Sequence, residues 1–320
     1  MMRRALLPIV VTLAVVTLSG CIYVDAGLGR NIEEVVVAES DRLFEVNRIA
    51  VIDVDGFIAS GEPWLFFAGT SVADVKERLQ RAENDWRVKA VVLRINSPGG
   101  EATASDIIHR EVVRFKAESK KPVVAALMGT AASGGYYVAC AADHIVASPT
   151  CITGSVGVVM NFYNVEGLYN KLGLETVVIK SGEKKDIANP ARPMTDEERA
   201  ILQGLNRTLY ERFVAAVKEG RSGMTGDDFE AISDGRPVSA PEAQRLHMVD
   251  ALGYLEDAIE QAITLAEVPD ADVIMYKSER SQNTNIYAGS AAVSQLMQEG
   301  LGILLRRSGP NFLYLWMPEQ

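Results

Sequence analysis

A serine followed by two glycines stands where an apolar, strand-like run gives way to a helix-like segment. The run Pro122–Met128 leads through small residues into Ser133, Gly134 and Gly135. This layout would place one hydroxyl at a helix N-terminus, where backbone N–H groups and the helix dipole favour developing negative charge. Ser133 could therefore attack a carbonyl and hold the resulting oxyanion. The alternative is an ordinary turn in which Ser133 only caps the helix.

A serine nucleophile needs a base, and none of the three histidines comes with a motif. His144 opens a strand-like segment too close in sequence to fold back easily onto Ser133. His109 lies on the charged face of a helix expected over Asp106–Lys116, and His247 lies in a later helix-like stretch. A lysine is the other choice for the base.

Two lysines, Lys184 and Lys185, lie in the polar loop Ser181–Pro190, after an apolar strand predicted over Thr176–Ile179. A lysine can act as a general base only when it is neutral, which requires burial in a dry site. Successive side chains of extended backbone point to opposite sides, so at most one of the two lysines can face a serine. The alternative is a solvated basic loop.

Two further segments complete a recognisable order of motifs. Residues 96–100, Asn-Ser-Pro-Gly-Gly, close a buried strand predicted over Ala90–Ile95, and the run Thr153–Val159 follows the serine segment. Together with the Ser-Gly-x-x-Lys-Asp loop, this order resembles the bacterial signal peptide peptidase A family from about Arg48 to Leu265. These are serine–lysine peptidases related to Clp protease. The resemblance implies an α/β fold of the Clp/crotonase type, with repeated ββα units, a largely parallel sheet and a helical C-terminal part.

The resemblance also implies roles for individual residues. Ser133 matches the family's nucleophile, and Lys185, which directly precedes the aspartate, matches the general base; the other lysine is the weaker candidate. Ser155 matches the position that hydrogen-bonds the lysine and orients it, like the third member of a triad. The backbone N–H groups of Gly100 and Gly134 match the oxyanion hole.

The reaction expected from these residues is peptide-bond hydrolysis by a serine endopeptidase that uses no metal or nucleotide cofactor. The three cysteines have no metal-ligand spacing, and no Walker or Rossmann glycine pattern follows a strand. Two other classes remain as alternatives. One is a non-catalytic scaffold or binding ring with the same fold. The other is an acyl-CoA hydratase-type enzyme, whose cytoplasmic substrates conflict with the export signal described next.

The N-terminus indicates export. Arg3 and Arg4 precede the apolar run Ala5–Leu18, whose 14 residues suit a signal-peptide core rather than a membrane span. The run ends in Leu-Ser-Gly-Cys, which resembles a bacterial lipoprotein signal with Cys21 as the lipidated N-terminus; a plain signal peptide or short anchor is the alternative. We expect a lipoprotein anchored by Cys21 in a membrane outside the cytoplasm, on the periplasmic or outer face of the cell membrane or in the outer membrane.

Composition fits a folded, exported enzyme. The chain has 320 residues, of which 48% are hydrophobic and 23% charged, enough for a substantial core. The net charge is −10, and loss of Arg3 and Arg4 with the signal would leave 30 basic against 42 acidic residues, or −12. This acidic balance argues against a nucleic-acid partner. Cys140 and Cys151 are expected to be buried core thiols, with a disulfide between them as the alternative.

The expected organisation is a signal peptide over 1–20, a tether over 21–47, a peptidase domain over 48–267 and an extension with an apolar tail over 268–320. Alternating strand and helix patterns indicate βαβ units in the domain. The aromatic segment 62–68 is expected to be a loop packed on the core or a rim facing lipid or substrate. Strands are predicted over 48–54, 90–95, 123–128, 144–147, 155–159 and 176–179; helices over 72–83, 104–116, 134–141, 165–172 and 195–219, and from about 238.

The tail and the assembly complete the expectations. Residues 296–305 resemble an apolar helix face, and the apolar run Leu313–Met317 is expected to pack on the body or a subunit interface, or to occupy a substrate groove. The resemblance implies a ring or bowl of copies, in which a site can draw Ser133 from one subunit and Lys185 from its neighbour. It also implies apolar, extended substrates such as cleaved signal peptides, bound by strand addition beside Ser97–Gly100.

Overall fold

The computed structural model describes residues 32–42, 46–61, 69–278, 285–286 and 313–315. The chain divides into two units at Glu33, and the second unit carries the fold described below. The predicted signal peptide with Cys21, the aromatic segment 62–68 and the apolar run 296–305 lie outside the described residues.

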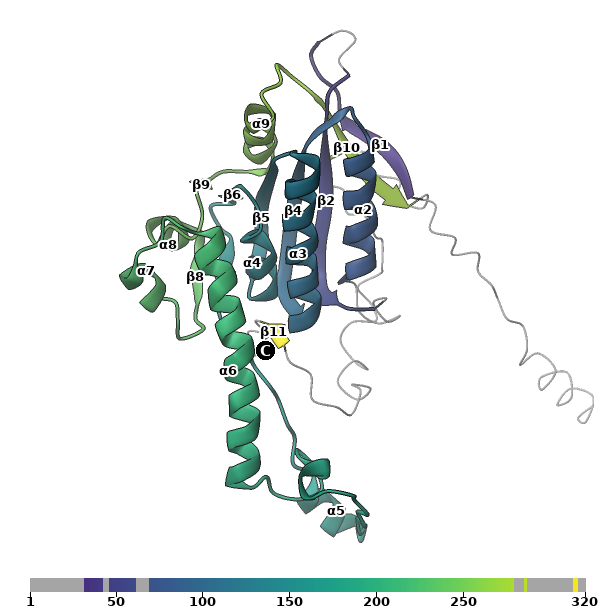
Figure 1. Cartoon of the computed structure of the whole chain (residues 1–320), viewed down its shortest axis with the longest axis vertical. Coiled ribbons are helices and arrows are strands. Elements are labelled where there is room, and N and C mark those ends of the chain that lie inside the picture. Colours follow the sequence, from purple (N-terminus) through teal and green to yellow (C-terminus); the bar gives the residue numbers. More distant parts are fainter. Residues whose placement is uncertain (1–31, 43–45, 62–68, 279–284, 287–312, 316–320) are drawn as a thin grey trace, which may run out of the picture. The chain divides into compact units, whose positions relative to one another are not determined.

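A largely parallel, eleven-stranded sheet forms the centre of the described structure (Figure 1). The strands are β1 (Ile32–Ala38), β2 (Arg48–Ala59), β3 (Gly69–Ser71), β4 (Val88–Glu101), β5 (Val123–Ala132), β6 (His144–Ala147), β7 (Ile152–Gly154), β8 (Pro237–Ser239), β9 (Ala251–Leu252), β10 (Asp272–Ser278) and β11 (Leu313–Leu315). The main path runs β1-β10-β2-β4-β5-β6-β9. Off this path, β3 pairs with β2, β11 with β4, β7 with β5, and β8 with β7. The β7–β8 and β4–β11 pairs are antiparallel, whereas β2, β4, β5 and β6 pair with one another in parallel along the centre of the sheet. The predicted α/β class with a largely parallel sheet is confirmed.

Helices cover both faces of this sheet. The helical elements of the described residues are α2 (Val72–Asn84), α3 (Ala102–Ser119), α4 (Gly134–Ala139), α5 (Glu166–Leu172), the 3-10 turn η2 (Glu183–Asp186), α6 (Asp196–Gly220), α7 (Gly226–Glu230), α8 (Ala240–Arg245) and α9 (Leu255–Leu265), and those on the sheet faces include α2, α3, α4 and α9. None of the helices in the described ranges is long and apolar enough to cross a membrane.

Alternation along the central strands explains how both faces are buried. Ile49 and Val51 of β2 and Val92 of β4 pack against Ala258 and other residues of α9. The intervening residues point to the opposite face, where α2, α3 and α4 lie (Figure 1). Strands buried on both faces are continuously apolar, as expected for a parallel sheet.

The predicted helix starts are confirmed by their caps. The Ser71 side chain accepts a hydrogen bond from the Asp74 amide at the start of α2, and Thr195 does the same for Glu198 at the start of α6. Both form complete capping boxes, which satisfy two otherwise free backbone donors. α8 has a proline in its first turn, where the missing N–H has no helical partner to lose.

Two strands do not form at the predicted positions. The strand predicted over 155–159 lies instead at Ile152–Gly154, because Gly154 and Ser155 have positive φ angles of 76° and 52° that end the extended backbone. Residues 176–179 form no regular element. No strand of the described residues pairs with them, and Ile179 is 97% exposed.

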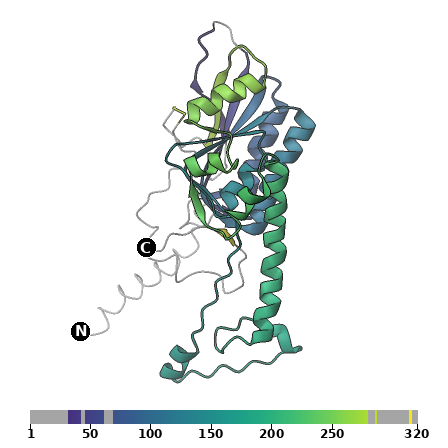
Figure 2. The same cartoon turned by 90° about the vertical axis from the view of Figure 1, so that its left-hand side faces the viewer.

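The segment that contains these residues projects from the sheet as an arm, defined here as residues 159–205. It comprises α5, η2 and the N-terminal part of α6, with α5 near the far end of α6 (Figures 1 and 2). Of the seventeen large hydrophobic residues that are exposed in the described part of the chain, ten lie in the arm. An apolar surface this concentrated is typical of a protein–protein contact.

Candidate active site

Ser133 lies at a strained turn between β5 and α4. Its backbone angles are φ 52° and ψ −115°, a conformation that non-glycine residues adopt only under local constraint. Although Ser133 occupies the N-cap position of α4, its side chain forms no capping hydrogen bond. The alternative that this serine serves only as a helix cap is therefore wrong.

Two backbone hydrogen bonds hold Ser133 in this turn. Its N–H donates to the Gly154 carbonyl at 2.8 Å, and its carbonyl accepts from the Tyr137 N–H at 2.8 Å. The residue is only 1% exposed. Within the described residues the Ser133 hydroxyl has no hydrogen-bond partner, so its lone pairs remain available for chemistry.

The glycine-rich end of β4 lies beside this turn. Ser97 of β4 pairs with Ala131 of β5, so Gly100 and Ser133 follow at the carboxyl ends of adjacent parallel strands. A side chain at Gly100 would put its Cβ 2.0 Å from the Ile58 carbonyl oxygen of β2. One at Gly135 would lie 2.7 Å from the Ser97 carbonyl oxygen, because the first turn of α4 packs directly on β4. Both glycines are required by close backbone approach.

Ser155 lies next to Ser133 through β7. Gly154 of β7 pairs with Ala132 of β5, and its carbonyl receives the Ser133 N–H. Ser155 follows at once, is 7% exposed, and donates its own N–H to the Arg236 carbonyl at 2.9 Å. The structure thus brings together Ser133, Gly134, Gly100 and Ser155 from segments far apart in the sequence.

Lys185 does not join this group within the chain. It is exposed in η2, whose Asp186 carboxylate binds Arg192, which in turn binds Glu198 near the start of α6. The helix of Ser133 meets α6 much later, where Tyr137 packs on Phe213. At 1.5 Å per residue, Glu198 and Phe213 are about 22 Å apart along α6.

The two adjacent lysines differ in their environment. The Lys184 ammonium pairs with the Glu197 carboxylate, and this hydrogen bond raises the pKa of Lys184, which opposes a role as a neutral base. Lys185 forms no ion pair with any described residue. Of the two, Lys185 remains the better candidate.

The C-terminal strand lies against the same edge of β4. β11 is antiparallel to β4, with Leu313 opposite Glu101, Tyr314 opposite Gly100 and Leu315 opposite Gly99. β2 pairs with one edge of β4 at Gly99 and Gly100. β5 pairs with the opposite edge only as far as Ala131, and β11 lies along that edge beyond this point. It also contacts α3 and α4 (Figure 1). Leu313–Leu315 therefore lie along the edge at which the sequence analysis expects a substrate strand.

Comparisons with known proteins agree with this arrangement. The family model for peptidase family S49 matches residues 115–269, and that for Clp protease matches residues 68–152. A putative protease of Methanocaldococcus jannaschii is 37% identical over 71% of this chain and 71% of its own length. This chain belongs to peptidase family S49. A putative signal peptide peptidase SppA of Enterococcus faecium is 34% identical over 76% of this chain and 71% of that protein.

Membership of family S49 makes the chain a serine protease similar to SppA and Protease 4. Among solved structures, a membrane-bound stomatin-specific protease aligns with 68% of this chain and 84% of its own, at 18% identity and a TM-score of 0.44. The predicted resemblance and the Clp-like fold are both confirmed.

The histidines of this S49 protease are engaged elsewhere. His109 was expected on a charged helix face, but this was wrong: it is 6% exposed and packs edge-on against Tyr137. It flanks the stripe Ile108–Val112–Phe115 by which α3 packs. Burial lowers the pKa of His109 to about 4. His144 lies near Asp250 and His247 contacts Asp228. In the described part of the chain none of the three bonds Ser133.

The predicted state of the two internal cysteines is confirmed. Cys140 and Cys151 are buried and free. Burial raises the pKa of each thiol to about 12, so neither is a thiolate nucleophile at ordinary pH.

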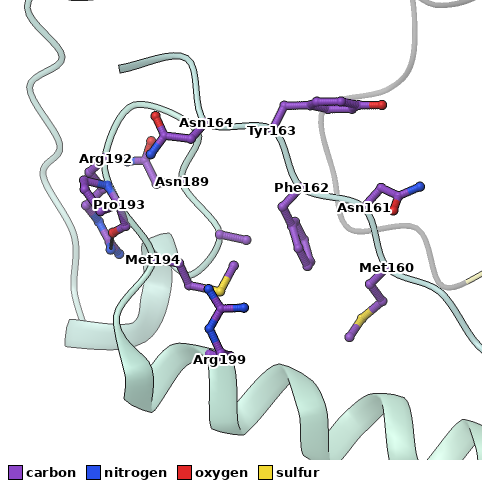
Figure 3. A pocket seen from close by; sticks show the side chains of 11 residues that line it. Met160, Asn161, Phe162, Tyr163, Asn164, Asn189, Arg192, Pro193, Met194 and Arg199 are labelled. Carbon is purple, nitrogen blue, oxygen red and sulfur yellow. Dashed lines mark hydrogen bonds between the residues drawn. The ribbon is translucent and has the colours of Figure 1, made fainter. Parts of the chain in front are cut away.

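A cavity of about 660 Å³ lies in the arm, and the sequence analysis missed it. Figure 3 shows Met160 and Phe162 on one segment near Met194 and Arg199 on another. These residues come from the loop before α5 and from the segment that leads into α6 and its first turn, which no local motif connects. The cavity belongs to the arm and contains none of the residues that surround Ser133.

Proposed function

We propose that this S49 protease is an endopeptidase that uses a Ser133–Lys185 dyad completed between neighbouring copies of the chain. One observation carries the proposal. Ser133 lies in a strained, buried turn with no base beside it among the described residues, whereas Lys185 is exposed in a loop bound to the first turn of α6, about 22 Å along that helix from Phe213, where α4 packs. A neighbour's Lys185 could reach Ser133 and become buried on contact, the condition under which a lysine becomes neutral.

In this mechanism neutral Lys185 accepts the proton of the Ser133 hydroxyl as its oxygen attacks the peptide carbonyl. Ser155 orients the lysine. The N–H groups of Gly100 and Gly134 stabilise the tetrahedral oxyanion. Protonated Lys185 then gives its proton to the leaving amine, and the acyl-enzyme is hydrolysed when Lys185 activates a water molecule.

The arm supports assembly into a homo-oligomer. Leu168, Leu172, Val177 and Ile179 are each more than half exposed, although they are apolar. Burying them against a second copy would remove this surface from water. Among the described residues no backbone hydrogen bond joins the apolar segment 176–179 to another segment, and its backbone groups could pair with a strand across an interface.

The proposed substrates are extended, apolar peptides such as cleaved signal peptides. They would add as an antiparallel strand to β4 at Gly99–Glu101, the edge that β11 takes. The small residues Ala131 and Ala132 are fully buried beside Ser133, which favours a small or apolar residue next to the cut. Lipid on Cys21 would hold the exported enzyme at a membrane surface, close to such peptides.

Labelling with a fluorophosphonate probe tests the dyad. Wild-type protein should be labelled, and Ser133→Ala and Lys185→Ala should not be, whereas the matched control Lys184→Ala should keep its labelling. Mixing the two inactive variants tests the shared site, because about a quarter of the sites in a random cyclic assembly would receive both residues. Absent labelling of folded wild-type protein would favour a non-catalytic scaffold. Labelling without complementation would place both residues in one copy.

Membrane attachment and substrate preference are tested separately. Cys21→Ala should move the protein from the membrane fraction to the soluble fraction, with the catalytic variants as controls. A peptide library should be cut next to small or apolar residues. A cleavage profile led by charged residues would contradict the proposed pocket.

A further inference from the structure

Tyr137 lies one helical turn after Ser133 and is held by two other helices. Its side chain is fully buried, with the ring 5.2 Å from His109 of α3 and 4.9 Å from Phe213 of α6. Its hydroxyl donates to Oδ1 of Asp106 at 2.5 Å, and Nε of Arg212 donates to the same oxygen at 2.9 Å. Both ends of this residue are therefore fixed.

The turn at Ser133 needs such support. A residue held at φ 52° and ψ −115° stores strain that relaxes unless the surroundings oppose it. α4 has six residues, too few for a helix to persist by its own hydrogen bonds. The Ser133 carbonyl is held by the Tyr137 N–H, so the position of Tyr137 fixes the position of Ser133.

We propose that Tyr137, anchored by Asp106, is a positioning residue for Ser133 in the reaction proposed above. The Asp106 carboxylate holds the phenol, and Arg212 holds the carboxylate from α6. Tyr137 transmits this constraint through its backbone N–H to the serine carbonyl. Tyr137 itself does not touch the substrate.

The charges around Asp106 suit this role. Its carboxylate accepts hydrogen bonds from the Tyr137 hydroxyl and the Arg212 guanidinium, and the His109 ring lies close enough to interact electrostatically with it. Burial lowers the pKa of His109 to about 4, so the imidazole is neutral at working pH and contributes packing rather than charge. Asp106 and Arg212 form an ion pair across α3 and α6.

The adjacent tyrosine provides a matched control. Tyr136 is also fully buried, and its hydroxyl donates to the Met248 carbonyl at 3.0 Å. Tyr136→Phe removes an equally buried hydrogen bond from the same helix. It leaves the Asp106 contact intact.

The experiment compares fluorophosphonate labelling and peptide hydrolysis in the full chain. Tyr137→Phe should slow labelling of Ser133 and lower kcat by about 10- to 100-fold, the range for loss of a hydrogen bond to a charged group, while KM stays within about threefold. The reduction should be the same at every pH, because the base is untouched. Tyr136→Phe should label at the wild-type rate.

Asp106 supplies a second route that does not alter the buried ring. Asp106→Ala should lower the labelling rate as Tyr137→Phe does, and the double variant should be no slower, since both remove one contact. Asp106→Asn keeps an acceptor oxygen and should restore most of the rate. Melting temperatures of all variants provide the check on folding.

Three outcomes overturn the inference. Labelling of both Tyr137→Phe and Asp106→Ala at the wild-type rate would refute it. Equal slowing in Tyr136→Phe would mean that any buried hydroxyl of α4 matters, and not this anchor. If wild-type Ser133 is never labelled, the proposed function fails, and the inference fails with it.

Discussion

Removing the C-terminal strand should activate the enzyme. β11 pairs with β4 at Gly99–Glu101, the edge proposed to bind substrate, and it contacts the helix of Ser133. A peptide substrate must therefore displace Leu313–Leu315 before it can bind. Deleting residues 313–320 removes this competitor without changing any group proposed to act in the chemistry.

The expected size of the effect follows from the short pairing. A three-residue antiparallel strand forms about two backbone hydrogen bonds with its neighbour, each worth a net ~0.5–1.5 kcal/mol. After the cost of ordering the strand, a net preference of ~1.4 kcal/mol would leave the edge blocked in about ten of eleven molecules. Deletion should then raise kcat/KM by about tenfold.

Hydrolysis of a short, soluble peptide is the assay. KM should fall and kcat should stay the same, since the tail competes with substrate and is displaced at saturation. A synthetic peptide of residues 310–318 should inhibit the shortened enzyme competitively. The control deletion of 318–320 keeps β11 and should leave kcat/KM unchanged.

Point substitutions separate backbone pairing from side-chain effects. Successive N–H groups of a strand point to opposite sides, so the N–H of either Leu313 or Tyr314 faces β4. One of the variants Leu313→Pro and Tyr314→Pro therefore removes an N–H group that can bond β4. That variant should behave like the deletion, whereas Tyr314→Ala should keep the strand. An unchanged kcat/KM in the 313–320 deletion, with the oligomer intact, would refute the reasoning. A broken oligomer would instead identify the tail as an interface.

Three further predictions concern the site and its support. Gly100→Ala should slow labelling about 100-fold, because its Cβ would lie 2.0 Å from a β2 carbonyl oxygen beside the expected oxyanion site; Gly129→Ala, with its nearest neighbour at 3.6 Å, should not. Lys185→Arg should lower kcat about 100-fold or more, and the wild-type rate should rise with pH, since only a neutral amine accepts the proton. Arg221→Leu should lower the free energy of unfolding by about 3 kcal/mol, measured by urea denaturation, because it removes the guanidinium that donates hydrogen bonds to both carboxylate oxygens of Asp250.

The last of these effects depends on pH. Burial alone would raise the pKa of Asp250, but the Arg221 guanidinium and the Ile145 N–H lower it. A carboxyl group with a lowered folded-state pKa stabilises the protein fully above its unfolded pKa, and this stabilisation is lost as the pH falls through the folded-state value. The difference in the free energy of unfolding between the wild-type protein and Arg221→Leu should therefore shrink below about pH 4.

The local features of the site could be predicted from the sequence because each depends on neighbouring residues. Ser71 and Thr195 cap their helices through side chains three residues from their partners, and an apolar run followed by Ser133 and two glycines predicts the turn. The strand at His144–Ala147 begins and ends as predicted. In each case the signal and the structure it produces lie within a few residues.

Features that depend on distant partners could not be predicted. Residues 176–179 have the composition of a strand, but a strand forms only beside another, and none of the described strands pairs with them. The helical period of α3 places His109 on the packed face of the helix, where its ring contacts that of Tyr137. The anchor of Tyr137 joins α3, α4 and α6, and no spacing in the sequence reveals that Asp106 and Arg212 share one partner.

The course of α6 relates these observations to one another. The helix has 25 residues, about 37 Å, and touches the chain's own nucleophile helix at Phe213 while its first turn holds the loop of Lys185 through Arg192. A straight helix of this length fixes the positions of both the Ser133 turn and the Lys185 loop, and so keeps these two groups of one chain apart. Hydrolysis would then require a neighbour, and an isolated chain would carry a serine without a base. Arg212 of the same helix binds the Asp106 carboxylate that holds Tyr137. In the proposals made above, the contact of the arm with a neighbouring copy and the alignment of Ser133 would therefore both depend on α6.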